Sequence, residues 1–416
     1  MKNASSHSRL AICAYIIGTI WLLLQIVIVV VYKDIPQGYD AVRYQRLAES
    51  MTSTGEWYPT AEQIEDSSIV APYIIYPGLI NYLILLIKIF GSIRPAFWIN
   101  VAFNIIYAAS GIFIANKLAG KGIGYLYFIL FCLSHQNVLD VGFTLSELPS
   151  LALAYAGAAL CISSRRTLTA TGGLLFGLSY YFRPSAILVL LTVMVLIITL
   201  KKSRIKLITL LTGTAVSLCG IMIMNHVISE KYWFISSNTL GINMYLGAND
   251  ESTGLTGGTT DRELDEEISG HNSFESDAIY RHKAEEWIAD HPTAWLGLAI
   301  KKLDHQTTTD HLFHMYRLEE NPVIAHDDIF LLKCIKICWL WYPRIYDWVL
   351  VLLFVYGLWM WRSKLKDGYW PMLIPVAGTL LLCILTIADY RYNATMMPVL
   401  YFFGAIGISR LKGLIR

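Results

Sequence analysis

Long apolar stretches follow one another along almost the whole sequence, and they constrain the fold more than any other feature. The first runs from Leu10 to Val31 and contains no charged residue. A helix needs roughly 20 mostly apolar residues to cross the hydrocarbon core of a bilayer, and this stretch meets that length. Further apolar stretches cover residues 73–91, 96–117, 122–138, 145–163, 168–182, 184–200, 205–228, 345–362, 370–387 and 394–410.

The composition supports the same class of protein. Only 15% of the 416 residues are charged and 55% are hydrophobic, whereas a soluble globular protein has about 25% charged residues. The formal net charge is only +2, which excludes a basic nucleic-acid-binding protein, and the apolar content excludes a disordered chain. We therefore predict an all-α polytopic membrane protein.

The positions of the basic residues indicate which stretches cross the membrane. If 73–91 spans, there are eleven spans, and the basic clusters at 117–121, 165–166 and 201–206 fall outside, against the positive-inside rule. If 73–91 is instead an interfacial or re-entrant helix, as Lys88 within it favours, about ten spans remain and these clusters are cytoplasmic. Both termini are then cytoplasmic as well. An arrangement with an external amino terminus stays open.

The predicted topology divides the chain into three parts. Residues 1–229 form an N-terminal transmembrane module with an outer loop at 33–95, residues 230–344 form a large, partly helical outer loop, and residues 345–416 form a C-terminal three-helix transmembrane segment. An outer loop of about 100 residues is more often functional than a passive connection.

Two helical features are predicted inside the large outer loop. Apolar residues recur at helical spacing over 276–303, and His291-Pro292 interrupts them, so we expect two helices that meet near that dipeptide. The stretch 329–342 mixes Ile, Leu and Trp with lysines. It is too short to span the membrane and is typical of a second interfacial helix.

Asp40 follows the first span by a few residues, at the outer side of the membrane. The spacing of Val42, Leu47 and Met51 predicts a short amphipathic helix directly after it. One interpretation is that this helix holds the Asp40 carboxylate at the edge of a cavity where a membrane-bound substrate meets a water-borne one. The other is that Asp40 only caps the helix.

Glu147 lies at the outer beginning of the fourth span, in the string LSELP. A carboxylate at the edge of the hydrocarbon is costly, which makes it a functional candidate. The alternative is again helix capping, because Ser146, Glu147 and Pro149 together form a reasonable helix start.

Three further charged residues lie in outer hairpins between spans. Arg183 precedes Pro184 at the tip of a hairpin without an adjacent acid, so it is suited either to bind a phosphate or to extend toward the lipid headgroups. Asp389 and Arg391 lie between the last two spans. They either pair with each other, or Arg391 provides a second contact to an anion.

The spacing of the cysteines and histidines does not match a known disulfide or metal-binding motif. The seven cysteines all fall within apolar stretches and are typical of small core residues. His311 and His314 are spaced to share a helix face next to Asp310, so a metal site there is conceivable, but no HExxH-type signature is present. Solvated or hydrogen-bonded histidines are the favoured interpretation.

Taken in order, these motifs resemble the C-type superfamily of polytopic glycosyltransferases, and within it the aminoarabinose-transferase and protein-O-mannosyltransferase-like branch. The resemblance rests on Asp40 with Tyr44 in the first outer loop, the Pro- and Tyr-rich segment 71–91, and Glu147 opening the fourth span. Later parts of the pattern are Arg183-Pro184, the Asn- and Gly-rich string at 238–254, and ADYRYNATMMP at 388–398. Relatives often have a second acid after the first-loop Asp, where this chain has Ala41.

The resemblance implies an enzyme that moves a sugar from a polyprenyl-phosphate donor to a lipid, glycan or protein acceptor at the outer face, in one inverting step. It implies that Asp40 is the general base and that Glu147 orients the acceptor, the donor or a bound cation. Arg183 and Arg391 would stabilise the leaving phosphate. The implied substrate-binding residues also include Tyr44, Asp389, Asn243 and Asn249.

The resemblance further implies a bacterial inner membrane and a role in cell-envelope glycan synthesis. The resemblance implies no definite cofactor, and it leaves open whether a divalent cation is required. The expected partners are the lipid-linked donor, the bilayer and the acceptor, with no nucleic acid. One alternative is an outer-face glycan polymerase or ligase. The other is a lipid-linked sugar transporter or flippase, and the scarcity of charge in the middle of the spans disfavours transport.

Overall fold

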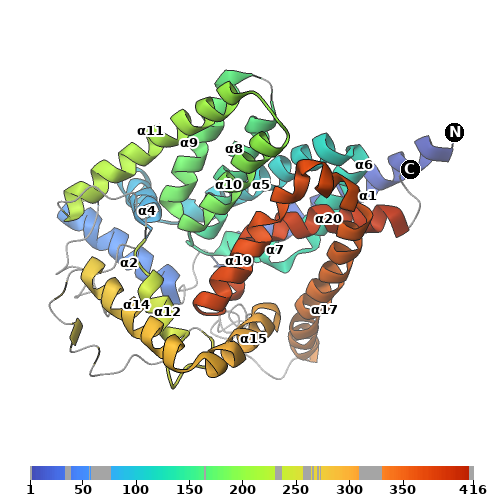
Figure 1. Cartoon of the computed structure of the whole chain (residues 1–416). Coiled ribbons are helices and arrows are strands. Elements are labelled where there is room, and N and C mark those ends of the chain that lie inside the picture. Colours follow the sequence, from blue (N-terminus) through green and yellow to red (C-terminus); the bar gives the residue numbers. More distant parts are fainter. Residues whose placement is uncertain are drawn as a thin grey trace.

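The protein folds into a bundle of helices (Figure 1). The computed structural model describes residues 2–32, 39–55, 57, 76–163, 165–229, 237–255, 264, 267–268, 271, 273–308 and 330–411. Within these residues there is no β-strand, and an isolated bridge joins Leu255 to Ala388. The prediction of an all-α polytopic membrane protein is confirmed.

Each predicted apolar stretch coincides over most of its length with a helix or a pair of consecutive helical segments, as far as the structure describes it. The N-terminal part consists of α1 (Lys2–Tyr32), α2 (Tyr39–Thr54), α4 (Pro77–Phe90), α5 (Pro95–Ala119), α6 (Lys121–Leu133), α7 (His135–Leu139), α8 (Glu147–Ile162), α9 (Arg166–Phe182), α10 (Ile187–Thr199) and α11 (Arg204–Ser229). The C-terminal part consists of α17 (Phe330–Met360), α18 (Arg362–Lys364), α19 (Ile374–Leu385) and α20 (Met397–Leu411). Short helical turns η1 (Asp140–Gly142), η2 (Pro184–Ala186), η3 (Leu365–Tyr369), η4 (Trp370–Leu373) and η5 (Tyr390–Thr395) connect them.

Helix length alone supports fewer spans than the sequence predicts. In the described part of the chain, five helical segments are long and apolar enough to cross a membrane, or six if the bent pair Lys121–Leu133 and His135–Gly142 counts as one span. Four other apolar helical segments have only 10–17 residues: Pro77–Phe90, Glu147–Ile162, Pro184–Thr199 and Met397–Leu411. The count of ten spans, the division into three parts and the orientation of the termini therefore remain predictions.

The outer-loop helices end where the sequence predicts. α12 (Leu240–Leu246) is followed by α14 (Ser273–Asp290) and α15 (Pro292–Thr308), so the predicted break near His291-Pro292 is confirmed. The prediction of a separate helix at 329–342 is wrong, because α17 runs without a break from Phe330 to Met360. Pro343 lies inside this helix, which accommodates it without ending.

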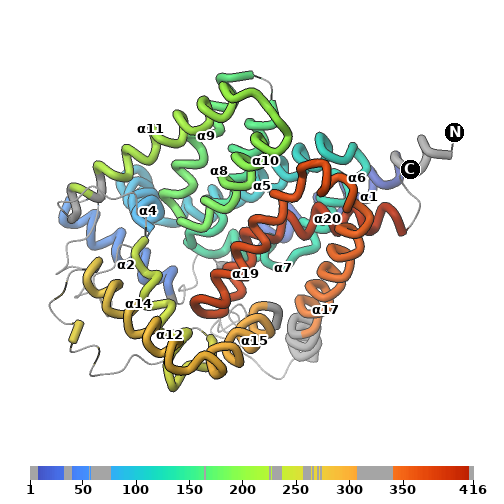
Figure 2. The backbone as a smooth tube through the Cα atoms, in the orientation of Figure 1, coloured from blue at the N-terminus to red at the C-terminus, as the bar shows by residue number. Residues whose placement is uncertain are grey.

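Two apolar cores hold the bundle together. The larger one lies between α5, α6, α8, α17 and α20 and includes the fully buried rings of Tyr127, Phe131 and Tyr401. The second joins α2 and α4 to α14 through residues such as Leu47, Leu83 and Tyr280. In Figure 2, α2 lies beside α12 and α14 at one end of the molecule, although more than 180 residues separate α2 from either helix in the sequence. The described part of segment 73–91, α4, thus packs at this same end, and the interfacial placement of the segment remains a prediction.

Helices α9 and α11 approach each other closely at glycines. A Cβ atom on Gly213 of α11 would collide with the carbonyl of Ala170 and with Gly173 on α9. Small residues at such crossings let helix backbones pack within van der Waals contact in a membrane. The approach would be impossible with any larger residue at either glycine.

We expect Gly213→Val to lower the free energy of unfolding by about 1–3 kcal/mol, the usual cost of overpacking a tight contact. The measurement is denaturant unfolding in detergent. Gly220→Val is the matched control, because Gly220 is on the same helix and a Cβ there would meet nothing within 4 Å. Equal losses in the two variants would mean that helix propensity, not packing, sets the cost.

Candidate active site

The first component of the site is the start of α2. Asp40 lies in the first helical turn, and its side chain is 36% exposed. One turn later, Tyr44 is buried, with its ring edge-to-face against Tyr76 at a centroid distance of 6.0 Å. Burial, with a contribution from the Asp40 charge, raises the pKa of the Tyr44 hydroxyl well above its ordinary value. Tyr44 therefore remains a neutral phenol and cannot serve as a base at neutral pH.

The second component joins the start of α8 to the end of α9. Glu147 is the first residue of α8, and its Oε1 lies 2.9 Å from Nη1 of Arg183. The same Nη1 donates to the Ser146 hydroxyl over 3.1 Å. Both charged side chains are buried, with exposures of 10% for Arg183 and 5% for Glu147. Arg183 thus does not extend toward headgroups, and Glu147 forms an ion pair rather than serving only as a cap.

Arg391 brings the remaining acids together. Its guanidinium contacts both carboxylate oxygens of Asp389, the shortest distance being 2.7 Å, and its Nη2 donates to Oδ2 of Asp40 over 3.1 Å. Its Nη1 lies 3.9 Å from Oε1 of Glu147. Asp389 and Arg391 therefore pair, as one sequence interpretation predicted, and a contact from Arg391 to a bound anion remains a prediction.

The Asp389 carboxylate is held in its ionised form. Burial by itself would raise its pKa, but Arg391 outweighs this effect through its charge and its side-chain and backbone hydrogen bonds, and the pKa is lowered from its ordinary value. Hydrogen bonds and an opposite charge stabilise a carboxylate in this way. Asp389 is thus a permanent counter-charge for Arg391.

Five predicted residues meet in one cluster, which we call the charged cluster: Asp40, Glu147, Arg183, Asp389 and Arg391. They come from α2, α8, the end of α9 and the turn into η5. Three carboxylates face two guanidiniums, so one negative charge is in excess. Asp40 and Arg391 are its accessible members, with exposures of 36% and 27%, whereas Asp389 is 1% exposed.

Two tyrosines that the sequence analysis did not identify enclose Arg183. The Arg183 guanidinium carbon lies 5.3 Å from the ring centroids of both Tyr76 and Tyr392, a cation–π distance. Tyr76 has a φ of 41°, a left-handed conformation that is uncommon for an aromatic residue. Such strain is found where the surrounding structure requires a particular side-chain position. Both tyrosines lie in segments that the sequence resemblance includes, 71–91 and 388–398, but nothing in those segments singled them out from their neighbours.

An amide network fixes the hairpin that contains Asp389. Gln306 of α15 donates to the Asp389 carbonyl over 3.0 Å and to Oδ1 of Asn393 over 2.8 Å, and it accepts from the Asp389 backbone N–H. Asn393 in turn donates to the Gln306 carbonyl. Because α15 belongs to the long segment between the apolar helices α11 and α17, this network ties that segment directly to the charged cluster. No sequence pattern singled out Gln306.

The two asparagines that the resemblance implicates lie elsewhere. Asn243 is on α12, and Asn249 follows it, where its side chain bonds the Tyr245 carbonyl and the Glu251 backbone N–H. Among the described residues, no contact joins either asparagine to the charged cluster. Their role in binding substrate remains a prediction.

The described residues contain no group of three or more His, Cys, Asp or Glu arranged to hold a metal ion. The carboxylates of the charged cluster instead face guanidiniums, an arrangement that does not fit a bound cation. His311, His314 and Asp310, the metal site considered from the sequence, lie outside the described residues.

Lys302 gives the contact between α15 and α19 a pH dependence. Its side chain is fully buried, and its Nζ donates to the Ile384 carbonyl at the end of α19 over 3.0 Å. Burial lowers the pKa of Lys302 to about 8. The folded state then binds fewer protons than the unfolded state between pH 8 and the ordinary lysine pKa of about 10.4, so stability rises with pH across this window.

We expect this rise to be about 3 kcal/mol in wild type and to disappear in Lys302→Met, as measured by unfolding in detergent from pH 7.5 to 10.5. Lys301→Met is the control, since Lys301 is the exposed neighbour on the same helix. Parallel stability curves for wild type and Lys302→Met would contradict the assignment.

We compared the whole chain with known sequences and solved structures. No protein-family model matches the sequence, and no curated protein sequence does. Among solved structures, the apo oligosaccharyltransferase of Archaeoglobus fulgidus matches with a TM-score of 0.54 and 12% identity, covering 96% of this chain and 50% of that one.

Two further structures resemble the chain more loosely. The archaeal oligosaccharyltransferase AglB from Archaeoglobus fulgidus, in complex with an inhibitory peptide and a dolichol-phosphate, matches with a TM-score of 0.48 and 9% identity, over 96% of this chain and 50% of that one. ArnT from Cupriavidus metallidurans, bound to undecaprenyl phosphate, matches with a TM-score of 0.41 and 12% identity, over 95% and 77%.

The likeness establishes the fold. The chain shares the fold of the Archaeoglobus fulgidus oligosaccharyltransferase. It spans about half the length of the oligosaccharyltransferases that it matches.

Proposed function

We propose that this protein is a membrane glycosyltransferase that moves a sugar from a polyprenyl-phosphate donor to a lipid, glycan or protein acceptor. The observation that carries the proposal is the charged cluster. Its members come from four separate segments and meet at the end of the bundle next to the outer-loop helices, in the fold of an oligosaccharyltransferase. Buried and partly buried ionisable groups that gather in this way are typical of active sites.

In the proposed reaction, Asp40 accepts the proton of the acceptor hydroxyl or amine. The freed electron pair attacks the anomeric carbon, and the bond from that carbon to the phosphate oxygen breaks with inversion. Polyprenyl phosphate leaves with the bonding electrons. Asp40 is suited to the role of base because it is the most exposed acid of the cluster, at 36%, and a base must contact the incoming group.

Arg391 is suited to stabilise the phosphate that leaves. It is 27% exposed, and a guanidinium can offer paired donors to phosphate oxygens. Arg183 is enclosed by Glu147, Tyr76 and Tyr392, so we assign it the task of holding Glu147 in place. Asp389 orients Arg391, and Tyr44, Asn243 and Asn249 remain proposed contacts to the substrates.

Basic residues in the loops at the other end of the bundle, such as Lys201, Lys202 and Arg204, support an outer position for the charged cluster through the positive-inside rule. We accordingly propose an outer-face reaction at a bacterial inner membrane. The accessible carboxylate and guanidinium at the cluster suit group transfer better than transport, which would require charge along a path through the spans.

The test is to mix detergent-purified protein with a lipid extract from the membranes of the organism that encodes it, and to follow free polyprenyl phosphate by mass spectrometry. Release that depends on both the protein and an acceptor fraction is expected. Lengthening of a lipid-linked saccharide instead would identify a polymerase or ligase. Movement of a labelled lipid-linked sugar across proteoliposomes without any turnover would identify a transporter.

A further inference from the structure

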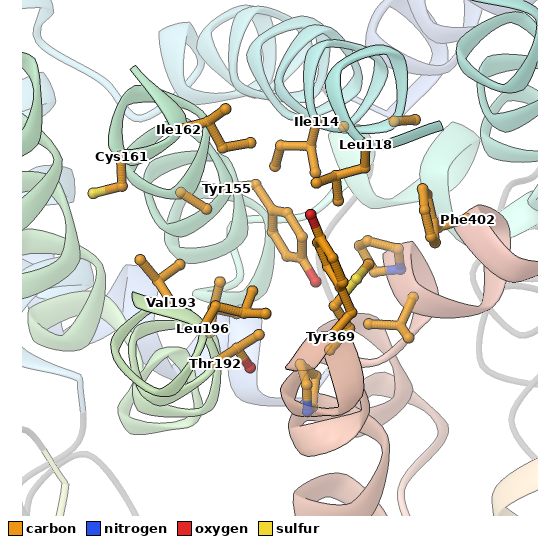
Figure 3. A pocket seen from close by; sticks show the side chains of 18 of the residues that line it. Ile114, Leu118, Tyr155, Cys161, Ile162, Thr192, Val193, Leu196, Tyr369 and Phe402 are labelled. Atoms are coloured by element: carbon orange, nitrogen blue, oxygen red, sulfur yellow. The ribbon is translucent and has the colours of Figure 1, made fainter. Parts of the chain in front are cut away.

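A second candidate site lies within the bundle. A cavity of about 290 Å³, partly open at the surface of the chain, is lined mainly by helices α5, α8, α10 and α20. Figure 3 shows side chains from several of these helices pointing into one space, among them Ile114, Val193, Leu196 and Phe402. The lining is almost entirely apolar, and its volume is at the small end of the range for ligand pockets, about 300–1,000 Å³.

One end of this cavity is distant from the charged cluster. Helix α8 begins in the cluster at Glu147 and meets the cavity at Tyr155, Ala158 and Cys161. At 1.5 Å per residue, Cys161 lies about 21 Å along the helix axis from Glu147. The cavity therefore extends to the opposite end of the bundle, where α10 turns into α11 (Figure 1).

Two lysines lie at that end of the cavity. Lys202 and Lys206 both line it, and none of its lining residues is acidic. Lys202 is exposed on the turn before α11, and Lys206 is half-buried in the first turn of that helix. Lys206 uses one donor on the Ser163 carbonyl at 2.8 Å, and an ammonium has three. Within the described residues, neither lysine forms an ion pair with an acid.

We propose that this cavity binds one acyl chain of an anionic membrane phospholipid, with the lipid phosphate held between Lys202 and Lys206. The apolar walls match a hydrocarbon chain, and the two cations at one end match a phosphate. Lysines near a bilayer surface attract anionic lipid headgroups in this manner. The phosphate between the lysines is not that of the sugar donor, because the donor phosphate would have to lie at the charged cluster, about 21 Å from Cys161 along α8.

The test uses delipidated wild-type protein and native mass spectrometry with three probes: phosphatidylglycerol, phosphatidylcholine and undecaprenyl phosphate. Wild type is expected to retain one phosphatidylglycerol in preference to phosphatidylcholine. The double variant Lys202→Ala, Lys206→Ala is expected to bind phosphatidylglycerol about 30-fold more weakly, from the usual contribution of two lysines at a lipid surface.

A matched control separates this site from general surface charge. The double variant Lys364→Ala, Lys366→Ala removes two exposed lysines of the adjacent segment that do not line the cavity, and it should bind like wild type. Ala158→Leu keeps both lysines but fills the cavity, and it should also lose the bound lipid. This variant preserves the test if the lysine variant folds poorly.

The proposal fails if both double variants lose phosphatidylglycerol equally, because the attraction would then be general. It also fails if phosphatidylcholine binds as well as phosphatidylglycerol, or if undecaprenyl phosphate displaces phosphatidylglycerol with the same dependence on Lys202 and Lys206. None of these readouts involves glycosyl transfer, so the proposal stands or falls independently of the proposed function.

Discussion

Replacing Asp40 by Asn should reduce sugar transfer by about 10²–10⁴-fold, the usual contribution of a positioned general base. Asparagine has nearly the same shape and can still accept the hydrogen bond that Arg391 now donates to Asp40 over 3.1 Å. It cannot, however, take a proton from the acceptor. The release of polyprenyl phosphate under saturating substrate measures the loss, and unfolding in detergent checks that the fold is intact.

The matched control for this prediction is Glu49→Gln. Glu49 is an exposed acid on the same helix and bonds only Gln45 among the described contacts, so its amide variant should retain wild-type turnover. If Asp40→Asn transferred sugar at the wild-type rate, Asp40 would not be the base, and the proposed mechanism would have to be abandoned even if the fold assignment stood.

Arg183→Met should destabilise the protein by about 3–5 kcal/mol, the usual cost of removing one partner from a buried ion pair. Methionine can fill much of the space between Tyr76 and Tyr392, but it leaves the Glu147 carboxylate buried at 5% exposure without the partner that lies 2.9 Å away. The free energy of unfolding in detergent measures this effect.

A double-mutant cycle distinguishes the ion pair from other contacts of Arg183. Glu147→Gln added to Arg183→Met removes the uncompensated charge, so the double variant should be more stable than Arg183→Met alone. Arg165→Met is the control, because Arg165 is exposed at the opposite end of the same helix, α9. Additive losses in the cycle would show that Arg183 and Glu147 do not interact energetically.

Much of the helical framework follows from local sequence. A stretch of apolar residues must become a helix in a membrane, because only a helix satisfies its own backbone hydrogen bonds there. Prolines then mark several of the starts, as Pro77, Pro95 and Pro292 do for α4, α5 and α15, since proline suits the first turn of a helix. These signals are local, and they placed α2, α14 and α15 correctly even in the outer loops.

The candidate site was predictable only in part. Charged residues next to apolar stretches are conspicuous, because a charge at the edge of the membrane costs free energy. This signal identified Asp40, Glu147, Arg183, Asp389 and Arg391. What each side chain contacts was not predictable. Tyr76, Tyr392 and Gln306 have no local feature that distinguishes them from other tyrosines and amides of the chain.

The sequence by itself therefore determined an all-helical membrane protein and the five charged residues of its cluster, because hydrophobicity and charge act at the level of single residues and short segments. Only the tertiary structure decided that Arg183 pairs with Glu147, that Arg391 binds Asp40 and Asp389, and that α17 continues through Pro343. These outcomes depend on the packing of helices that are distant in sequence, and packing determines which opposite charges come close enough to neutralise one another.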